Sequence, residues 1–306
     1  MPAARLAIVT GKGGVGKTTV AAGLARAAAR AGRNVLLVEI AIPGRLASVL
    51  DVDELPAVPT EVRPNLSAVS LDEGLALEHL VDRLLPMRLL SRRLLSSETF
   101  RIVAAAVPGI LEVALLAQIH GWLEPASGIR RKGFDLVILD APASGHSVPL
   151  LSSPNTLAGV ASFGPLGDVV RKISASLRDP KRTVAFVVAL PEEWAVAEAI
   201  ELFESLRDEL GVPVARPLLN AAYPRRFSKT DERLIGEAEA AGTIDPELLV
   251  AAHHFLERRE AVHRQVRALR NGTGEKPVEL PYLFSPTMLW DDLDPLADAV
   301  QAGLDS

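Results

Sequence analysis

A glycine-rich stretch near the start of this 306-residue chain constrains its fold more than any other feature. Residues 11–19 read GKGGVGKTT and fit the phosphate-loop pattern G-x-x-x-x-G-K-[ST]. Glycine allows the backbone N–H groups of such a loop to turn toward phosphate oxygens. The residues that we expect to surround bound phosphates are Gly13, Gly14, Val15, Gly16, Lys17, Thr18 and Thr19.

The segments on either side of the loop support this interpretation. An apolar segment at 6–10 predicts a buried parallel strand, and the Ala- and Leu-rich segment 18–30 predicts a helix. The positive end of that helix would face the same anion. Lys17 would then reach the β- and γ-phosphates, and the Thr18 hydroxyl would hold Mg²⁺. This order of elements favours a nucleotide site over a flexible glycine-rich turn.

The composition narrows the function classes. The chain is 48% hydrophobic and 23% charged, so it can fill a large core and remain in solution. Its net charge of −5 gives no overall basic surface for nucleic acid. It has no cysteine, which excludes disulfides and thiolate metal sites and predicts a cytoplasmic location. The apolar stretch 102–123 is interrupted by Pro108 and Gly109, which indicates a buried helix and no direct membrane insertion.

Strands and helices are expected to alternate along the chain, which predicts an α/β fold with a doubly wound, mostly parallel sheet. We expect one P-loop ATPase domain over residues 1–306. The expected strands lie at 6–10, 34–40, 66–71, 134–140, 183–190, 214–219 and 277–284. The expected later helices lie at 192–210, 245–271 and 292–304. The segments 41–50, 51–66, 141–146 and 221–229 are expected to be loops or surface connections.

Asp140 ends the clearest of the later strands, 134–140, which is mainly apolar. The carboxyl ends of parallel strands are where ligands bind in open α/β sheets, so Asp140 would lie beside the phosphate loop. A carboxylate there is suited to the water shell of Mg²⁺. We therefore expect Thr18 and Asp140 to hold the metal, and the segment 141–146 to move with the γ-phosphate.

The block 73–124 is predicted to be an inserted helical subdomain. Its expected helices cover 73–85, 87–95, 97–106 and 109–123. Leucines are dense between residues 84 and 95, with arginines among them, so that one wide face is apolar. That face either packs against neighbouring helices or forms a groove for an apolar client or helix.

The second lysine of the loop, Lys12, brings in a resemblance. The form K-G-G-x-G-K-[ST] resembles the deviant phosphate loop of the MinD, ParA, nitrogenase iron protein and ArsA group. In that group the extra lysine reaches across a dimer interface to the nucleotide of the other subunit. The resemblance therefore implies that Lys12 acts catalytically in a partner site.

Several segments together resemble the ArsA family of ATPases, over nearly the whole chain. They are 66–72, the turn PGILE at 108–112, the second-switch sequence DAPASGH at 140–146, Asn220, and PYLF at 281–284. The resemblance implies ATP and Mg²⁺ as cofactors and a dimer as the working form. It also implies that Asn220 reads the edge of the adenine and that 281–284 lies over the base.

Two departures from that family change what we expect. Ala41 stands where the first switch has the Asp that positions the attacking water. Glu39, two residues earlier, points the same way along a strand, so with Lys12 and Lys17 it is our candidate catalytic residue. Arg45 either supplies charge to phosphate or is a surface residue. The absence of cysteine argues against arsenite-stimulated activity and against a dimer held by zinc.

Three hypotheses follow. The first is a Mg²⁺-dependent ATPase that acts as a nucleotide-driven dimeric switch, with slow hydrolysis because of Ala41. The alternative is a catalytically impaired nucleotide-binding subunit of a heterodimer with a paralogous ATPase. The third is a positioning ATPase like MinD or ParA, which would need a basic membrane or DNA surface, whereas the segment 291–306 is acidic.

Overall fold

A computed structural model describes residues 4–40, 44–85, 107–124, 133–159, 163–285 and 288–305. Within these ranges the chain forms an eight-stranded sheet in the order β3-β4-β2-β5-β1-β6-β7-β8. Neighbouring strands run parallel except β3, which pairs antiparallel with β4. The strands are β1 (Leu6–Gly11), β2 (Val35–Ile40), β3 (Thr60–Arg63), β4 (Leu66–Leu71), β5 (Leu136–Asp140), β6 (Thr183–Ala189), β7 (Leu218–Ala222) and β8 (Val278–Pro281).

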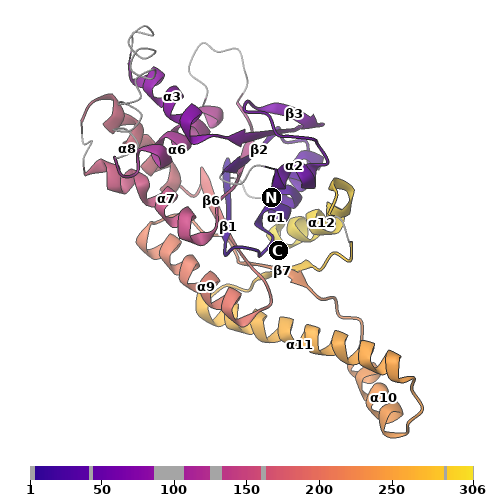
Figure 1. The fold of residues 1–306 in the computed structure, drawn as a ribbon. Coiled ribbons are helices and arrows are strands. Elements are labelled where there is room, and N and C mark those ends of the chain that lie inside the picture. The colour runs from indigo at the N-terminus through magenta and orange to yellow at the C-terminus, as the bar shows by residue number, and fades with distance from the viewer. Residues whose placement is uncertain are drawn as a thin grey trace.

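Helices cover both faces of the sheet (Figure 1). The helices are α1 (Lys17–Arg30), α2 (Arg45–Leu50), α3 (Glu73–Leu84), α6 (Ile110–Leu123), α7 (Ser144–Ala158), α8 (Gly164–Arg178), α9 (Glu193–Glu204), α10 (Lys229–Ala240), α11 (Pro246–Thr273) and α12 (Asp294–Asp305). A π-helical turn, η1 (Ser205–Glu209), continues α9, and a 3₁₀ turn, η2 (Trp290–Leu293), precedes α12.

Alternate residues of each central strand enter two separate cores. In β1, Leu6 and Ile8 pack with α3, α6, α7, α8 and α9, whereas Ala7 and Val9 pack with α1, α2 and α12. Side chains alternate between the faces of a strand, so a strand that is covered on both faces has no solvent-exposed position. This explains why all six residues of β1 and of β2 are buried.

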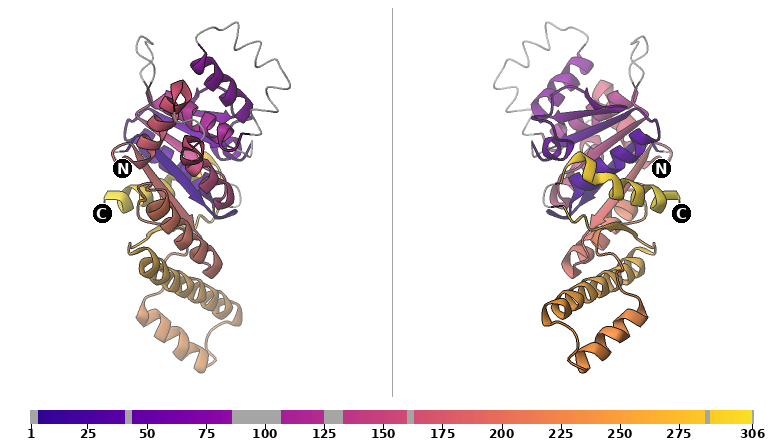
Figure 2. Two further views of the ribbon diagram at one scale, coloured as in Figure 1. Left: turned by 90° about the vertical axis from the view of Figure 1, so that its left-hand side faces the viewer. Right: turned by 90° about the vertical axis from the view of Figure 1, so that its right-hand side faces the viewer.

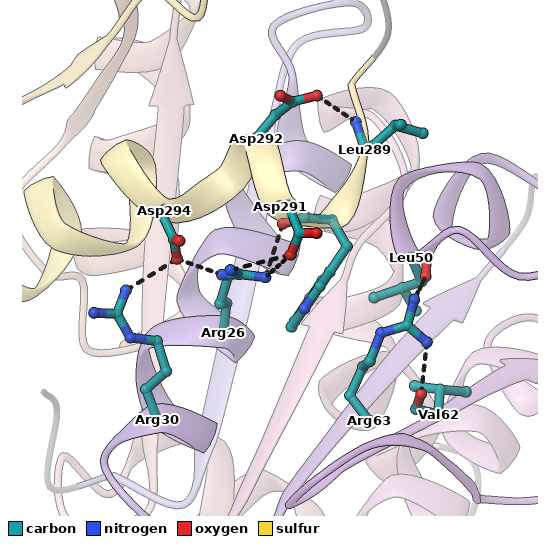
Figure 3. Close-up of polar contacts among 10 residues, drawn as sticks. Arg26, Arg30, Leu50, Val62, Arg63, Leu289, Asp291, Asp292 and Asp294 are labelled. Atoms are coloured by element: carbon teal, nitrogen blue, oxygen red, sulfur yellow. Dashed lines mark hydrogen bonds and ion pairs between the residues drawn. The ribbon is translucent and has the colours of Figure 1, made fainter.

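The C-terminal segment is fastened to α1. A Cβ atom at Gly23 would lie 2.5 Å from Cδ2 of Leu296, so α12 approaches α1 more closely than a larger residue would allow. Figure 3 shows Arg26 reaching from α1 to the Asp294 carboxylate, with Nε and Oδ1 2.6 Å apart. Arg26 also lies over the Trp290 ring, 4.8 Å from its centroid. These contacts fix the helix that follows the phosphate loop.

Helices α10 and α11 project from the sheet as an arm, which both views of Figure 2 show. No residue of α10 is buried, and Leu248 and Val250 near the start of α11 are exposed. The other end of α11 packs tightly against α9, because a Cβ atom at Gly272 would lie 2.6 Å from Cδ1 of Ile200. Arg259, near the middle of α11, also pairs with Glu279 of β8 at 2.6 Å, so the arm is anchored along the C-terminal half of α11.

The predicted doubly wound, mostly parallel sheet is confirmed. Five local predictions are wrong in part. Residues 45–50 of the predicted loop 41–50 form α2, and 60–63 of the predicted connection 51–66 form β3. The predicted loop 141–146 ends early, because α7 already begins at Ser144.

The strand predicted at 214–219 also differs. The regular strand, β7, begins only at Leu218 and continues to Ala222. Val214, at the start of the predicted strand, makes only an isolated bridge with Ala185. The predicted loop 221–229 is therefore shortened at both ends by β7 and α10. The sequence patterns did not predict α7, α8 or α10 at all. The helices predicted at 87–95 and 97–106, and Ala41, lie outside the described residues.

Candidate functional site

The phosphate-loop residues connect β1 to α1 at the carboxyl edge of the sheet. Gly14 and Gly16 have φ values of 85° and 86°, a region that L-residues with side chains rarely adopt. At Gly16 the surroundings add a second restriction, because a Cβ atom would lie 2.4 Å from Nδ2 of Asn220. The pattern's glycines are thus needed for the shape of the loop itself.

A cavity of about 1110 Å³ opens beside this loop. Phosphate-loop residues line one side, including Gly13, Lys17, Thr18 and Thr19. The carboxyl ends of β2 and β5 and the start of α2 line the other side, with Glu39, Asp140 and Arg45. The structure therefore brings the predicted phosphate-loop residues together with Glu39 and Asp140, except Val15, which is buried and does not line the cavity.

The two loop lysines each have a partner within the chain. Lys17 Nζ donates a hydrogen bond to the backbone oxygen of Lys12 over 2.8 Å. Burial lowers the pKa of Lys17, Asp140 opposes this effect, and the charge of Arg45 adds to it. Lys12 Nζ pairs with Glu198 Oε1 of α9 at 2.6 Å, and both side chains are 40% exposed. In this arrangement Lys12 lies along its own subunit.

Asp140 combines a hydrogen bond with an unpartnered oxygen. The Thr18 hydroxyl donates to Asp140 Oδ2 over 2.6 Å. Asp140 Oδ1 is buried and has no hydrogen-bond partner among the described residues. Burial raises the pKa of Asp140 to about 6, although the hydrogen bond from Thr18 and the charge of Lys17 act in the opposite direction. A buried carboxylate oxygen beside a hydroxyl is a donor set that suits Mg²⁺.

Glu39 is the strand neighbour of Asp140, since the two residues pair in register between β2 and β5. Its side chain is almost fully buried, and burial raises its pKa. Oε1 accepts a hydrogen bond from the backbone N–H of Leu46 at 2.8 Å, and Oε2 accepts one from Gly44 at 3.3 Å. Glu39 therefore holds the start of α2, which has no side-chain cap of its own.

Asn220 lies at the carboxyl edge in β7, against the phosphate loop. Its Nδ2 donates to the backbone oxygen of Val15 over 2.9 Å. Beyond it, the ring of Tyr282 lies 4.8 Å from those of Tyr223 and Phe284, centroid to centroid. Tyr282 and Phe284 are 38% and 53% exposed, so this aromatic cluster at the end of β8 is partly open to solvent.

Two residues of the site were not identified from the sequence. Glu198 is 186 positions from Lys12, and no local pattern indicates their contact. Ser147 accepts a buried hydrogen bond from the Thr10 hydroxyl at 2.8 Å and so joins α7 to β1. Both contacts depend on how the helices cross the sheet, which no short motif encodes.

Comparison with known proteins identifies the family of this chain. A family model described as "Anion-transporting ATPase" matches residues 4–163, which contain the phosphate loop, Glu39 and Asp140. The chain belongs to this ArsA ATPase family. The resemblance inferred from the sequence is thereby confirmed.

Individual relatives are similar at low identity. ATPase BagA of Mycobacterium tuberculosis is 26% identical over 253 residues, which cover 81% of this chain and 74% of that protein. The arsenical pump-driving ATPase of Acidiphilium multivorum is 27% identical over 240 residues, covering 72% of this chain and 40% of that protein. ATPase ASNA1 homolog 1 of Paramecium tetraurelia is 24% identical over 236 residues, which cover 65% of this chain and 69% of that protein.

Family membership makes this ArsA-family protein an ATP-binding ATPase. Proteins of this type generally use ATP and Mg²⁺. Among the described residues, no helix has the length and apolarity that a membrane crossing requires.

Proposed function

We propose that this chain binds ATP in the cavity beside the phosphate loop and acts as an ATP-driven dimeric switch. The observation that carries the proposal is the unpartnered Oδ1 of Asp140 beside the Thr18 hydroxyl. Thr18 and Asp140 would hold Mg²⁺, which would offset the charge of the β- and γ-phosphates. Lys17 would leave the Lys12 carbonyl and bind the same phosphates.

The adenine would lie toward β7 and β8. Asn220 uses its Nδ2 on the phosphate loop, while its Oδ1 has no partner among the described residues. This oxygen can accept a hydrogen bond from the exocyclic amine of adenine, which guanine lacks at that position. The exposed rings of Tyr282 and Phe284 offer apolar area to the same end of the nucleotide.

Dimerisation would involve the edge that carries Lys12. Trp194 lies four residues before Glu198 on α9, hence on the same face of that helix, and is 79% exposed. An exposed tryptophan is typical of a protein interface. Lys12 and Glu198 together give this edge one positive and one negative group, which a two-fold axis can pair between copies. ATP bound in a second copy would draw Lys12 away from Glu198.

We propose that hydrolysis is slow in the isolated chain, because Ala41 stands at the position of the expected water-positioning Asp. For the same reason a heterodimer with a paralogous ATPase is our second candidate. We further propose a cytoplasmic location and one P-loop ATPase domain with a helical insertion at about 73–124. An apolar client would bind at that insertion.

The test compares wild type with Lys17→Ala and Ala41→Asp. ATP turnover, ATP affinity and sedimentation are measured with Mg²⁺ and either ATP or ADP. The proposal expects ATP-dependent dimers and turnover in wild type, and neither in Lys17→Ala. If wild type binds ATP but only Ala41→Asp turns over, the chain is the impaired subunit of a heterodimer. A wild type that binds no ATP would refute both versions.

A further inference from the structure

Arg45 is the first residue of α2 and lines the cavity opposite the phosphate loop. Its side chain is exposed, and it makes no hydrogen bond or ion pair with any described residue. The other two long cations of the site are engaged, since Lys12 pairs with Glu198 and Lys17 donates to a backbone oxygen. Arg45 is therefore a cation at the cavity that makes no direct hydrogen bond or ion pair in the described part of the chain.

The charge of Arg45 acts on three groups of the site. It contributes to the lowered pKa of Lys17, and it opposes the rise in the pKa of both Glu39 and Asp140. Together with the place of Arg45 in the cavity lining, this puts its charge within reach of the groups that would surround a bound phosphate.

The backbone beneath Arg45 is held on both sides by one buried carboxylate. Glu39 accepts the N–H groups of Gly44 and Leu46, which are the residues directly before and after Arg45. Leu46 and Leu50 are completely buried, so α2 is also fixed from below. A six-residue helix has little stability alone, and these contacts supply the stability that its length does not provide. The fold thus uses a buried carboxylate to fix the backbone on both sides of Arg45.

We propose that Arg45 binds the γ-phosphate of ATP in its own subunit and stabilises the charge of the transferring phosphoryl group, and that Glu39 is the residue that positions it. This inference rests on the proposed ATP site. In hydrolysis, the water oxygen bonds to the γ-phosphorus as the bond from that phosphorus to the β–γ bridging oxygen breaks. The electron pair of the broken bond stays on ADP. One water proton remains on the phosphate product and the other goes to solvent.

A guanidinium is suited to this role because its planar donors match two phosphate oxygens at once and it stays charged at any working pH. It stabilises developing negative charge and cannot orient or deprotonate water. Arg45 therefore supplies a different contribution from the Asp that Ala41 replaces, and this contribution would support turnover in a chain without that Asp.

The test uses full-length Arg45→Met and Arg45→Lys, with Arg233→Met as the matched control. Arg233 lies on α10 and pairs only with Glu237 in the described part of the chain. We expect Arg45→Met to lower kcat at least about 100-fold, as loss of one preorganised charge donor does. Affinity for ATP should fall while affinity for ADP stays unchanged, because ADP lacks the γ-phosphate. Arg45→Lys should be intermediate, and Arg233→Met should match wild type.

Two further measurements separate a direct role from a structural one. Free guanidinium ion should restore part of the activity of Arg45→Ala, and thermal unfolding should show that all variants are folded. Glu39→Gln should reduce the preference for ATP over ADP without reducing ADP affinity. If Glu39→Gln alters only the melting temperature, its positioning role is wrong.

The outcomes also distinguish this inference from the proposed function. Equal kcat and equal ATP-to-ADP preference in wild type and Arg45→Met would overturn the inference alone. If wild type binds ATP but does not turn over, the ATP-to-ADP preference still decides whether Arg45 contacts the γ-phosphate. A wild type without ATP binding would overturn the proposed function and the inference together.

Discussion

The phosphate-loop side of the cavity and the side formed by β2, β5 and α2 differ in how their polar groups are satisfied. On the loop side, Lys17 and Asn220 bond to the loop backbone and Lys12 pairs with Glu198. On the opposite side, Asp140 has one buried oxygen without a hydrogen-bond partner. The guanidinium of Arg45 makes no hydrogen bond or ion pair with any described residue. The named side chains of the loop side each bond within the chain, whereas on the other side one oxygen of Asp140 and the Arg45 guanidinium do not.

This difference indicates what a nucleotide must do on each side. Breaking the half-exposed pair of Lys12 and Glu198 costs about 1 kcal/mol or less. A buried polar atom without a partner costs about 1–3 kcal/mol, which a ligand recovers when it satisfies that atom. Binding is therefore favoured mainly from the β5 side, while the loop side exchanges one set of partners for another at little net cost.

The largest effect should come from removing the charge at β5. Asp140→Asn should lower ATP turnover at least about 100-fold, because it weakens the proposed Mg²⁺ site. The same change should stabilise the nucleotide-free protein at pH 7.5 by about 1–3 kcal/mol, since burial raises the pKa of Asp140 to about 6 and the charged form is disfavoured. Turnover and the melting temperature without nucleotide measure the two effects. A lower melting temperature would contradict the comparison.

Thr18→Val should have the next largest effect. It removes the one hydrogen bond that Asp140 has and leaves both carboxylate oxygens without a side-chain partner. We expect a loss of about 1–3 kcal/mol in the free energy of unfolding, measured by urea titration. In the Asp140→Asn background the loss should be smaller, because the bond then joins two neutral groups. Equal losses in both backgrounds would show that the Thr18 hydroxyl acts independently of Asp140.

Asn220→Ala tests the loop side. The change removes one neutral hydrogen bond to the loop, so ATP affinity should fall about fivefold, which corresponds to about 1 kcal/mol. The preference for ATP over GTP should fall as well, if Oδ1 accepts from the adenine amine. Nucleotide titrations with ATP and GTP measure both quantities. An equal loss for the two nucleotides would restrict Asn220 to holding the loop.

The smallest effect is expected for Glu198→Gln, which frees Lys12 from its charged partner. ATP-dependent association should become stronger by fivefold or less, since a half-exposed ion pair contributes at most about 1 kcal/mol. Sedimentation at several protein concentrations measures this, and Glu201→Gln, an exposed position on the same helix, is the control. Weaker association in Glu198→Gln would mean that Glu198 contacts the second copy rather than retaining Lys12.

The part of the fold predictable from the sequence is the part with strong local patterns. The continuous apolar runs of β1, β2 and β5 indicate strands buried on both faces. Helix α7 was missed because Pro149 and Pro154 lie inside it, and proline ordinarily signals a helix end. Strand β3 was missed because it lies at the sheet edge with no buried residue, so its side chains carry no apolar alternation.

The same distinction applies to the site. The phosphate loop has its own sequence signature, and the position of Asp140 beside it follows from the rule that parallel strands end at a common edge. Helix α2 has no local cap, since Glu39 supplies the bonds from a neighbouring strand. For this reason the sequence left the role of Arg45 open. The partner of Lys12 lies on α9 and could be found only in three dimensions.

The arm gives the close contact between α9 and α11 a mechanical meaning. Helix α11 has 28 residues, and it is held from Gly272, which meets Ile200 of α9, as far as Arg259, which pairs with Glu279 of β8. The part of α11 before Arg259 is thus a lever of about 20 Å, whose base rests on β8 and on the helix that carries Glu198. A tilt of about 5° at this base displaces the far end by about 2 Å. A rotation of α9 on release of Lys12 would therefore be carried along α11 to the distal tip of the arm.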